Sequence, residues 1–265
     1  MNRRLGERER SNASVESGFD ARLKELEEAD EKGALTDFMI LGLVRASKTE
    51  EQFKTAESWL DKIKEDRVRT DLTNYFWFLR SELAIEEERF SDAERYAKKV
   101  PELEHRTILA FKQAEKQLQN INDRAFAYQT LNEIAKLART SETSVTKAKV
   151  LLGLAFQYEK FDHGFALEEL AEAVRVINRL KDPDLLSAAA YRQIIGKNFG
   201  FTASYGTPGY DLEKTFLEIS RNDFELALSN ARALDDRFLR TIAVLAVAKN
   251  CREKARKEAT ETPKN

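Results

Sequence analysis

Residues 151–173 read LLGLAFQYEKFDHGFALEELAEA, and this stretch decides the fold. Its second half places His163, Ala166, Leu170 and Ala173 at steps of three, four and three residues. Such spacing brings all four side chains to one face of a helix. Because two of them are alanines, a neighbouring helix can approach this face closely. The stretch therefore predicts a helix whose apolar face packs against a second helix.

The same spacing recurs at four other places in the chain. Successive copies start 37, 38, 35 and 61 residues apart along the sequence. A period of about 35–38 residues is typical of a helix–turn–helix unit, which cannot bury its apolar face alone and must stack on its neighbours. The other copies are Phe53, Ala56, Leu60 and Ile63; Phe90, Ala93, Ala97 and Val100; Tyr128, Leu131, Ala135 and Ala138; and Phe224, Ala227, Ala231 and Leu234.

A second motif follows three of these copies. The dipeptide Arg-Thr opens the next apolar helix at residues 69–70, 106–107 and 240–241. Because this motif repeats separately from the first, it strengthens the interpretation of the chain as a set of internal repeats.

The second-helix pattern resembles that of tetratricopeptide repeats. The resemblance is carried by ERFSDAERYAKKVP at 88–101 and RNDFELALSNARAL at 221–234, and it covers roughly residues 35–250. Most first helices lack the Gly and the leading Trp of that family, so a related helical-hairpin solenoid is the alternative.

Residues 151–173 resemble a nearly complete unit of that family. Leu152-Gly153 and Phe156 match its first-helix positions, and the second-helix positions are matched by Ala166, Leu170 and Ala173. The resemblance implies an extended groove that binds a protein or a peptide, a function carried by analogy of fold.

The composition also favours helices. Ten Gly and four Pro in 265 residues are well below the roughly 7% and 5% of an average protein. A chain so poor in turn formers is poorly suited to the many tight reversals of a β-sandwich or β-barrel. We therefore expect an all-α fold, a right-handed α-solenoid of about five tetratricopeptide-like helix–turn–helix repeats.

Charge, cysteine content and hydropathy bound the partners and the compartment. The 44 basic and 46 acidic residues give a net charge of −2, so no nucleic-acid partner is expected. Cys251 is the single cysteine, which excludes an intramolecular disulfide and a four-cysteine zinc site. No run approaches the roughly 18 apolar residues of a membrane span, and no signal peptide is recognisable, so we expect a cytoplasmic protein.

The apolar spacing predicts a helical domain over 19–250, between a flexible charged arm at 1–18 and a flexible tail at 251–265. Thr49 and Ser91 have capping-box spacing with Gln52 and Glu94, Asp211 and Asp223 are further expected helix starts, and the Asp-Pro pair at 182–183 predicts a start with Pro at the first helical position. The helices are expected at 19–32, 35–46, 49–64, 67–87, 90–100, 103–119, 123–139, 144–158, 163–180, 184–197, 211–220, 222–234 and 237–250.

The long offset of 61 residues marks an insertion, an aromatic and Gly-rich loop at 198–210. Four of the ten glycines and one of the four prolines lie between residues 196 and 209. The sequence Thr207-Pro208-Gly209-Tyr210 predicts a type II turn, with Gly209 at positive φ. Such a loop could recognise a partner or close as a lid over a pocket. Alternatively, its aromatic side chains pack back onto the helices and plug the groove.

Two segments supply candidate partner-binding residues. Residues 74–79, NYFWFL, form the densest aromatic cluster, and helix geometry cannot place six consecutive large side chains on one face. Most of the cluster is expected to pack between repeats, and the remainder to line a surface. The candidates are Asn74, Trp77 and Arg80 from the region of this cluster, and Phe201, Tyr205 and Tyr210 from the insertion and its end.

No catalytic, cofactor-binding or metal-binding residue is expected. His105 follows Glu102 at the Glu-x-x-His spacing of di-iron bundles, but such a site needs two of these motifs, and His163 is the only other histidine. His105 is expected at the surface and His163 in a partly packed position. Neither a G-x-S-x-G elbow nor a P-loop is present.

The sequence therefore predicts a non-enzymatic scaffold that binds a protein or peptide along the concave surface lined by the first helices. The alternative is an all-α enzyme or small-ligand-binding protein with the 198–210 loop as a lid. RNA binding by a helical repeat is a third class, and it would need a continuous stripe of Lys and Arg on the concave face.

Overall fold

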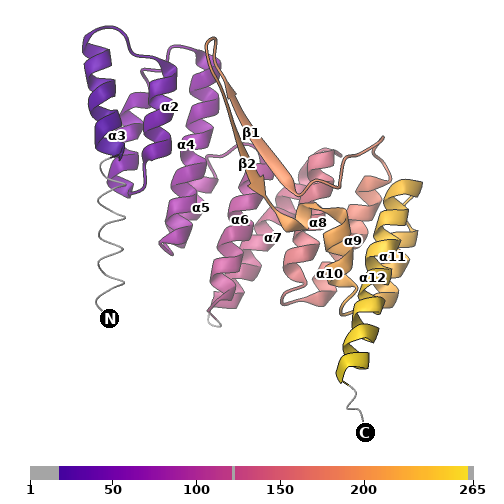
Figure 1. Cartoon of the computed structure of the whole chain (residues 1–265). Helices are drawn as coiled ribbons and strands as arrows, with labels where there is room; N and C mark the ends of the chain where they lie inside the picture. The colour runs from indigo at the N-terminus through magenta and orange to yellow at the C-terminus, as the bar shows by residue number, and fades with distance from the viewer. Residues whose placement is uncertain (1–17, 121–122, 262–265) are drawn as a thin grey trace. The chain divides into compact units, whose positions relative to one another are not determined.

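The structure, a computed structural model, describes residues 18–120 and 123–261, with residues 251–261 described for the backbone alone. Helices make up 70% of the chain, and one small antiparallel β-hairpin accompanies them (Figure 1). The expectation of an all-α fold is therefore corrected to a mainly α fold.

The chain divides into two compact units. The first unit comprises Met1–Glu102 and Tyr191–Ala203, and the second comprises Leu103–Ala190 and Ser204–Asn265. The chain returns to the first unit over residues 191–203, which form most of the β-hairpin.

The first unit contains two helical hairpins. A helix over residues 18–31 comes first, and α2 then packs against α3 and α4 against α5. The bounds are α2 Asp37–Ala46, α3 Glu50–Leu60, α4 Asp66–Glu86 and α5 Phe90–Ala97.

The second unit contains three further hairpin-like pairs and a closing helix. The pairs are α6 with α7, α8 with α9, and α10 with α11, while α12 packs on both α10 and α11. The bounds are α6 Leu103–Leu118, α7 Arg124–Thr140, α8 Val145–Tyr158, α9 His163–Ile177, the short 3-10 helix η2 Pro208–Tyr210, α10 Leu212–Ile219, α11 Phe224–Arg232 and α12 Arg237–Glu261.

One expected helix is wrong. The segment 184–197 contains strand β1, Ala189–Ile195, which pairs with β2, Gly200–Gly206, within the expected loop. Asp182 has a left-handed φ of 47° and caps no helix. Buried and exposed residues alternate along β1, but the sequence does not show the matching apolar and polar alternation. Arg192 faces inward among small and aliphatic residues, and Tyr191 faces outward.

The repeated apolar positions form the cores of the two units. They lie on α3, α5, α7, α9 and α11, the second helix of each pair, except that Ile63, Val100 and Leu234 follow the ends of α3, α5 and α11. Most are less than 9% exposed, and the rest are half-buried. The buried members are Phe53, Ala56, Leu60, Ile63, Ala93, Val100, Leu131, Ala135, Ala138, Ala166, Leu170, Ala173, Ala227, Ala231 and Leu234. The half-buried members are Phe90, Ala97, Tyr128, His163 and Phe224.

The Arg-Thr motif has a common structural role. Arg69 donates from Nη2 to the carbonyl oxygen of Ile63, and Arg240 donates from Nη1 to that of Leu234 at 3.0 Å. Each acceptor is the last apolar position of the preceding repeat copy, six residues earlier, so the arginine fixes the turn between two helices. The threonines each donate to the carbonyl four residues back, through Thr70, Thr107 and Thr241.

The turn at residues 207–210 is not of type II. The backbone N–H of Tyr210 bonds to the Thr207 carbonyl at 2.9 Å within η2, and Gly209 lacks a positive φ. Glycine is required at 209 by space, because a Cβ there would lie 2.8 Å from the Cα of Gly153 and 2.9 Å from the Cβ of Phe156. The insertion is thus held against α8 by a close backbone approach.

Three helix starts agree with the capping patterns, whereas Ser91 caps no helix because α5 begins one residue earlier, at Phe90. The side chains of Thr49, Asp211 and Asp223 each accept a hydrogen bond from the backbone N–H three residues ahead. The arm expected at 1–18 lies outside the described residues except for residue 18, and the segment expected as a tail at 251–265 begins within α12.

Candidate partner-binding surfaces

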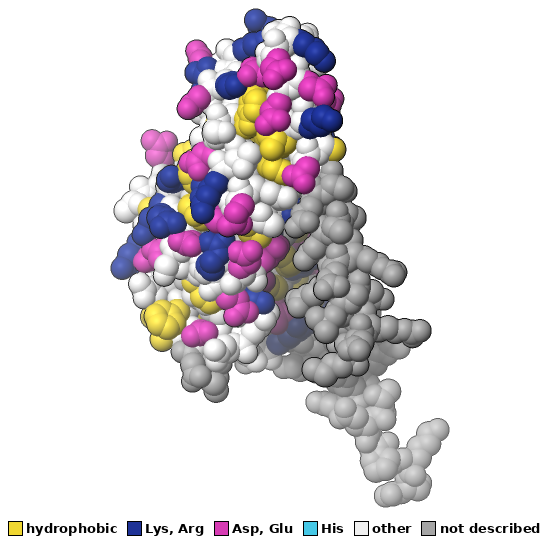
Figure 2. Space-filling view, turned by 90° about the vertical axis from the view of Figure 1, so that its left-hand side faces the viewer, with side chains coloured by type: hydrophobic (Ala, Val, Ile, Leu, Met, Phe, Trp, Pro, Cys, Tyr) yellow, Lys and Arg dark blue, Asp and Glu magenta, His cyan; other side chains and the backbone are white. Residues whose placement is uncertain are grey.

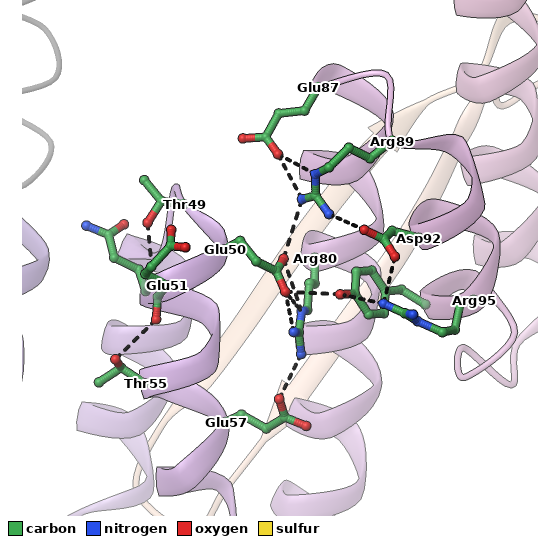
Figure 3. A network of polar contacts seen from close by, with 12 residues as sticks. Thr49, Glu50, Glu51, Thr55, Glu57, Arg80, Glu87, Arg89, Asp92 and Arg95 are labelled. Atoms are coloured by element: carbon green, nitrogen blue, oxygen red, sulfur yellow. Dashed lines mark hydrogen bonds and ion pairs between the residues drawn. The ribbon is translucent and has the colours of Figure 1, made fainter.

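Arg80, a candidate contact on α4, is only 6% exposed and joins three helices (Figure 3). Its guanidinium forms a bidentate contact with the Glu50 carboxylate, and its Nη1 lies 2.7 Å from Oε2 of Glu57. Both carboxylates belong to α3. Arg80 therefore satisfies its charge within the first unit.

Glu50 is the centre of this network. Its carboxylate also accepts a hydrogen bond of 3.0 Å from the Tyr96 hydroxyl and lies 3.4 Å from Nη2 of Arg89, both from the region of α5 (Figure 3). Burial alone would raise the pKa of Glu50, but the bonds from Arg80 and Tyr96 and the nearby positive charges outweigh it and lower that pKa. The ionised carboxylate thus ties α3, α4 and α5 together.

Trp77 and Asn74 also contact groups of their own unit. The Trp77 ring is 9% exposed, stacks on Tyr96 with centroids 5.7 Å apart, and has the ammonium of Lys99 3.4 Å above its centroid. Half-buried Asn74 donates to Oε1 of Glu102 at 3.3 Å. Lys99 therefore covers the indole through a cation–π contact.

Phe201 fixes the β-hairpin to the helices of the first unit. Its ring lies 5.4 Å from that of Tyr75 on α4, and the guanidinium of Arg45 on α2 lies 4.6 Å from its centroid. Phe199, near the tip of the β-hairpin, contacts Phe38 of α2 at 5.5 Å. The inner face of the β-hairpin is thus a packing surface.

Arg192 is the charged member of this inner face. It is 5% exposed, donates from Nη2 to Oε2 of Glu102 at 3.0 Å, and places its guanidinium 5.8 Å from the ring centroid of Phe78. The glutamate of the Glu-x-x-His pattern is therefore a partner of Arg192 and Asn74.

Tyr205 and Tyr210 contact α6 in the second unit. Tyr205 packs edge-on against His105 at 5.9 Å, which makes His105 a buried residue, 6% exposed, and corrects its expected surface position. Tyr210 is fully buried and donates to the Glu104 carbonyl at 2.9 Å. Burial, and then the charge of Glu104, raise the pKa of Tyr210 well above its ordinary value, so the phenol stays neutral.

The outward face of β1 offers exposed apolar side chains that the sequence analysis missed. Tyr191 is 58% exposed and Ile195 is 49% exposed, on either side of exposed Gln193. The outward positions of β2 beside them carry small residues such as Thr202 and Ser204. The signal in the sequence was the enrichment of β-branched and aromatic residues in YRQII and GFTASYG.

A cavity of about 450 Å³ lies along α7 and α9 in the second unit. Next to it, Glu169 is 1% exposed and pairs through one oxygen with Arg139 at 2.5 Å, while its second oxygen is buried without a partner. Burial raises the pKa of Glu169, although the charge of Arg139 opposes it. All residues that line the cavity come from these two helices, so the 198–210 segment is not its lid.

Over the described side chains, no group of three or more His, Cys, Asp or Glu residues could hold a metal ion. His163 is half-buried and pairs with Glu159, whose Oε2 lies 2.8 Å from its Nδ1. The side chain of Cys251 lies outside the described residues.

No family model, curated protein or solved structure matches this chain. Within the part of the chain that the structure describes, no helix is long and apolar enough to cross a membrane.

Proposed function

We propose that this chain is a non-enzymatic scaffold that binds a protein or peptide, built as a right-handed α-solenoid of five tetratricopeptide-like helical hairpins. The observation that carries the proposal is the repetition of one buried register on α3, α5, α7, α9 and α11. Repeats of this kind stack into extended surfaces, and such surfaces serve to bind other chains.

The contacts of the β-hairpin refine where a partner binds. In the first unit, Phe201 and Phe199 pack on α2 and α4, the first helices of their pairs. The surface of these first helices is thus partly occupied by the protein's own residues. We therefore place the partner on the outward face and free edge of β1, at Tyr191 and Ile195.

The occupant that fits this site is an extended segment of a partner protein. The sheet has two strands, so each strand has one edge that is not paired with another strand of the described residues. An incoming strand can use the backbone groups of the β1 edge and cover Tyr191 and Ile195 with its own side chains. Figure 2 shows Lys and Arg side chains interspersed with Asp and Glu on the face it presents, with no region of a single sign.

The test compares the intact protein with the double variant Tyr191→Ser, Ile195→Ser. A partner captured with the intact protein is purified and titrated against both by calorimetry. We expect the double variant to bind about tenfold more weakly or worse, because the two most exposed apolar contacts of the site are lost. Tyr210→Ala is unsuitable for this purpose, since Tyr210 is fully buried and its loss would destabilise the fold.

Leu226→Ser is the matched control, because Leu226 is 48% exposed on α11, in the second unit. It should bind the partner as the intact protein does. Equal binding by the β1 variant and the intact protein would refute the placement on β1. Failure of the intact protein to bind any purified partner, or turnover of a small substrate, would refute the scaffold function.

A further inference from the structure

A second concave site lies in the second unit, where the chain leaves α9 and where α12 begins. The cavity measures about 310 Å³. That volume is at the lower end of the range of about 300–1,000 Å³ for ligand pockets, so it suits one or two side chains rather than a large cofactor.

The apolar side chains that line the cavity are partly buried and partly exposed. Leu185 and Leu239 are buried and form the floor, at 0% and 3% exposure. Leu186 and Phe238 stand at the rim, at 39% and 61% exposure. Two exposed large apolar side chains beside a concavity are typical of a binding site.

The charged part of the rim has a single sign. Asp182, Asp184 and Asp236 line the cavity, and no lysine or arginine does. In the described part of the chain, none of the three carboxylates pairs with a cationic side chain. The site therefore combines apolar surface with three carboxylates that form no ion pair within the described residues.

Two of these carboxylates are held in place by backbone bonds. Oδ1 of Asp236 accepts from the N–H of Leu239 at 2.7 Å, which caps the start of α12. Oδ1 of Asp184 accepts from the N–H of Leu186 at 3.3 Å. Each aspartate uses one oxygen in this way, so its position at the rim is fixed before any ligand arrives.

The walls of the cavity are also tied together. Asn178, at the end of α9, donates to the Ala233 carbonyl at 2.8 Å and accepts from the N–H of Asp235 at 2.9 Å. The carbonyl of Leu185 accepts from the N–H of Leu212 at 3.0 Å. These bonds keep the two loops in register, which lowers the cost of ordering the site when it binds.

We propose that this cavity binds a peptide segment of a partner protein in which Lys or Arg adjoins a large hydrophobic residue. The hydrophobic side chain enters between Leu186 and Phe238, and the cation lies among the aspartates. Charge complementarity selects this occupant, because the lining carries three carboxylates and no cation, which disfavours acidic peptides and phosphates. The site is separate from the one proposed on β1, and its occupation does not depend on that proposal.

The probe is a fluorescent peptide of sequence Gly-Arg-Arg-Leu-Phe-Gly, measured by anisotropy against the full chain. Two comparison peptides replace either the arginines by glutamates or the Leu-Phe pair by Ser-Ser. We expect saturable binding of the first peptide alone, weakening as salt rises because the rim contacts are exposed.

The variant is Asp184→Asn, Asp236→Asn, which removes two charges but keeps side-chain oxygens that accept the backbone bonds. We expect it to weaken binding by about threefold to thirtyfold, the effect of losing two exposed ion pairs. Asp223→Asn is the matched control, since Asp223 caps α11 in the same unit but does not line the cavity. That control, and the Tyr191→Ser, Ile195→Ser variant, should bind as the intact protein does.

Three results would overturn the proposal. Equal binding of all three peptides would show that the site does not select basic and apolar chemistry, and unchanged binding by the Asp184, Asp236 variant would show that the peptide binds elsewhere. The chain's own Arg3-Arg4-Leu5 has the same chemistry. If the probe bound only to the full-length variant Arg3→Glu, Arg4→Glu, the natural occupant would be this segment rather than a partner.

Discussion

The guanidinium of Arg240 lies 3.0 Å from the backbone carbonyl oxygen of Leu234, the last apolar position of its repeat copy. Arg69 makes the same contact with Ile63, at the same separation of six residues. In both cases the arginine belongs to the helix that follows, α12 or α4, and reaches back to the end of the second helix of a pair. In these two copies the arginine of the Arg-Thr motif therefore connects successive helical elements.

Arg240→Ala should lower the free energy of unfolding by about 1.5–3 kcal/mol, because a hydrogen bond from a charged donor is lost and the carbonyl of Leu234 is left without it. The measurement is denaturant unfolding followed by circular dichroism. Arg232→Ala, an exposed position on α11, should change stability by less than about 0.5 kcal/mol. Equal losses in the two variants would contradict the connector role.

The helices were predictable because each carries its own periodic apolar face and, in several cases, its own cap. Thr49, Asp211 and Asp223 all act as the sequence indicates. The β-hairpin was not predictable in this way, because its inward face holds Arg192 and its outward face Tyr191, the reverse of the usual polarity. Arg192 forms an ion pair with Glu102, which is far away along the chain, so no local sequence pattern indicates where Arg192 lies.

For the candidate residues, too, the sequence predicted part of the result and missed the rest. The sequence indicated that Trp77, Arg80 and Tyr210 were unusual, but an anchor for a partner and an anchor for the fold require the same residue types. Only the positions of Glu50 and Glu57 show that Arg80 is already paired. The cavity at Asp184 was not predictable, because one wall is the segment 182–186 and the other is Asp236 with the first residues of α12, far apart along the chain.

Gly209→Ala should be destabilising by about 1–3 kcal/mol, the usual cost of forcing an extra methyl group into a packed site. The new Cβ would lie 2.8 Å from the backbone Cα of Gly153, which cannot move aside as a side chain can. Gly206→Ala, in the same segment, meets nothing within 4 Å and should change stability by less than about 1 kcal/mol. Thermal unfolding of the two variants gives the comparison, and a Gly209 variant as stable as the Gly206 variant would refute the close approach.

Arg80→Ala should lower the free energy of unfolding by about 1.5–3 kcal/mol, because the half-buried Glu50 carboxylate loses its charged hydrogen bonds from a buried arginine. Arg95→Ala is the control, since the Arg95 side chain is 63% exposed and pairs with Asp92 at the surface. It should cost much less than Arg80→Ala, because water screens an exposed ion pair. Chemical denaturation of both variants is the measurement, and a small loss for Arg80→Ala would show that the network does not hold α3, α4 and α5 together.

The buried carboxyl of Glu169 gives a prediction about pH. Burial raises its pKa above the ordinary value of 4.5, so the folded protein keeps this proton at a pH where the unfolded chain has lost it. In that window the folded state binds more protons than the unfolded state, and the free energy of unfolding falls as the pH rises from 4.5 through the raised pKa. Below 4.5 both states are protonated, and the contribution of this group is complete.

Glu169→Gln removes this titration while keeping the shape of the side chain. Subtracting the free energy of unfolding of the intact protein from that of the variant cancels all other groups, and the difference should rise as the pH increases from 4.5 towards neutrality. Urea unfolding of the intact protein and of the variant at a series of pH values measures this difference. A flat or falling difference for the Glu169 variant would mean that Arg139 compensates the buried charge fully, because only an uncompensated carboxylate makes the folded state hold the extra proton.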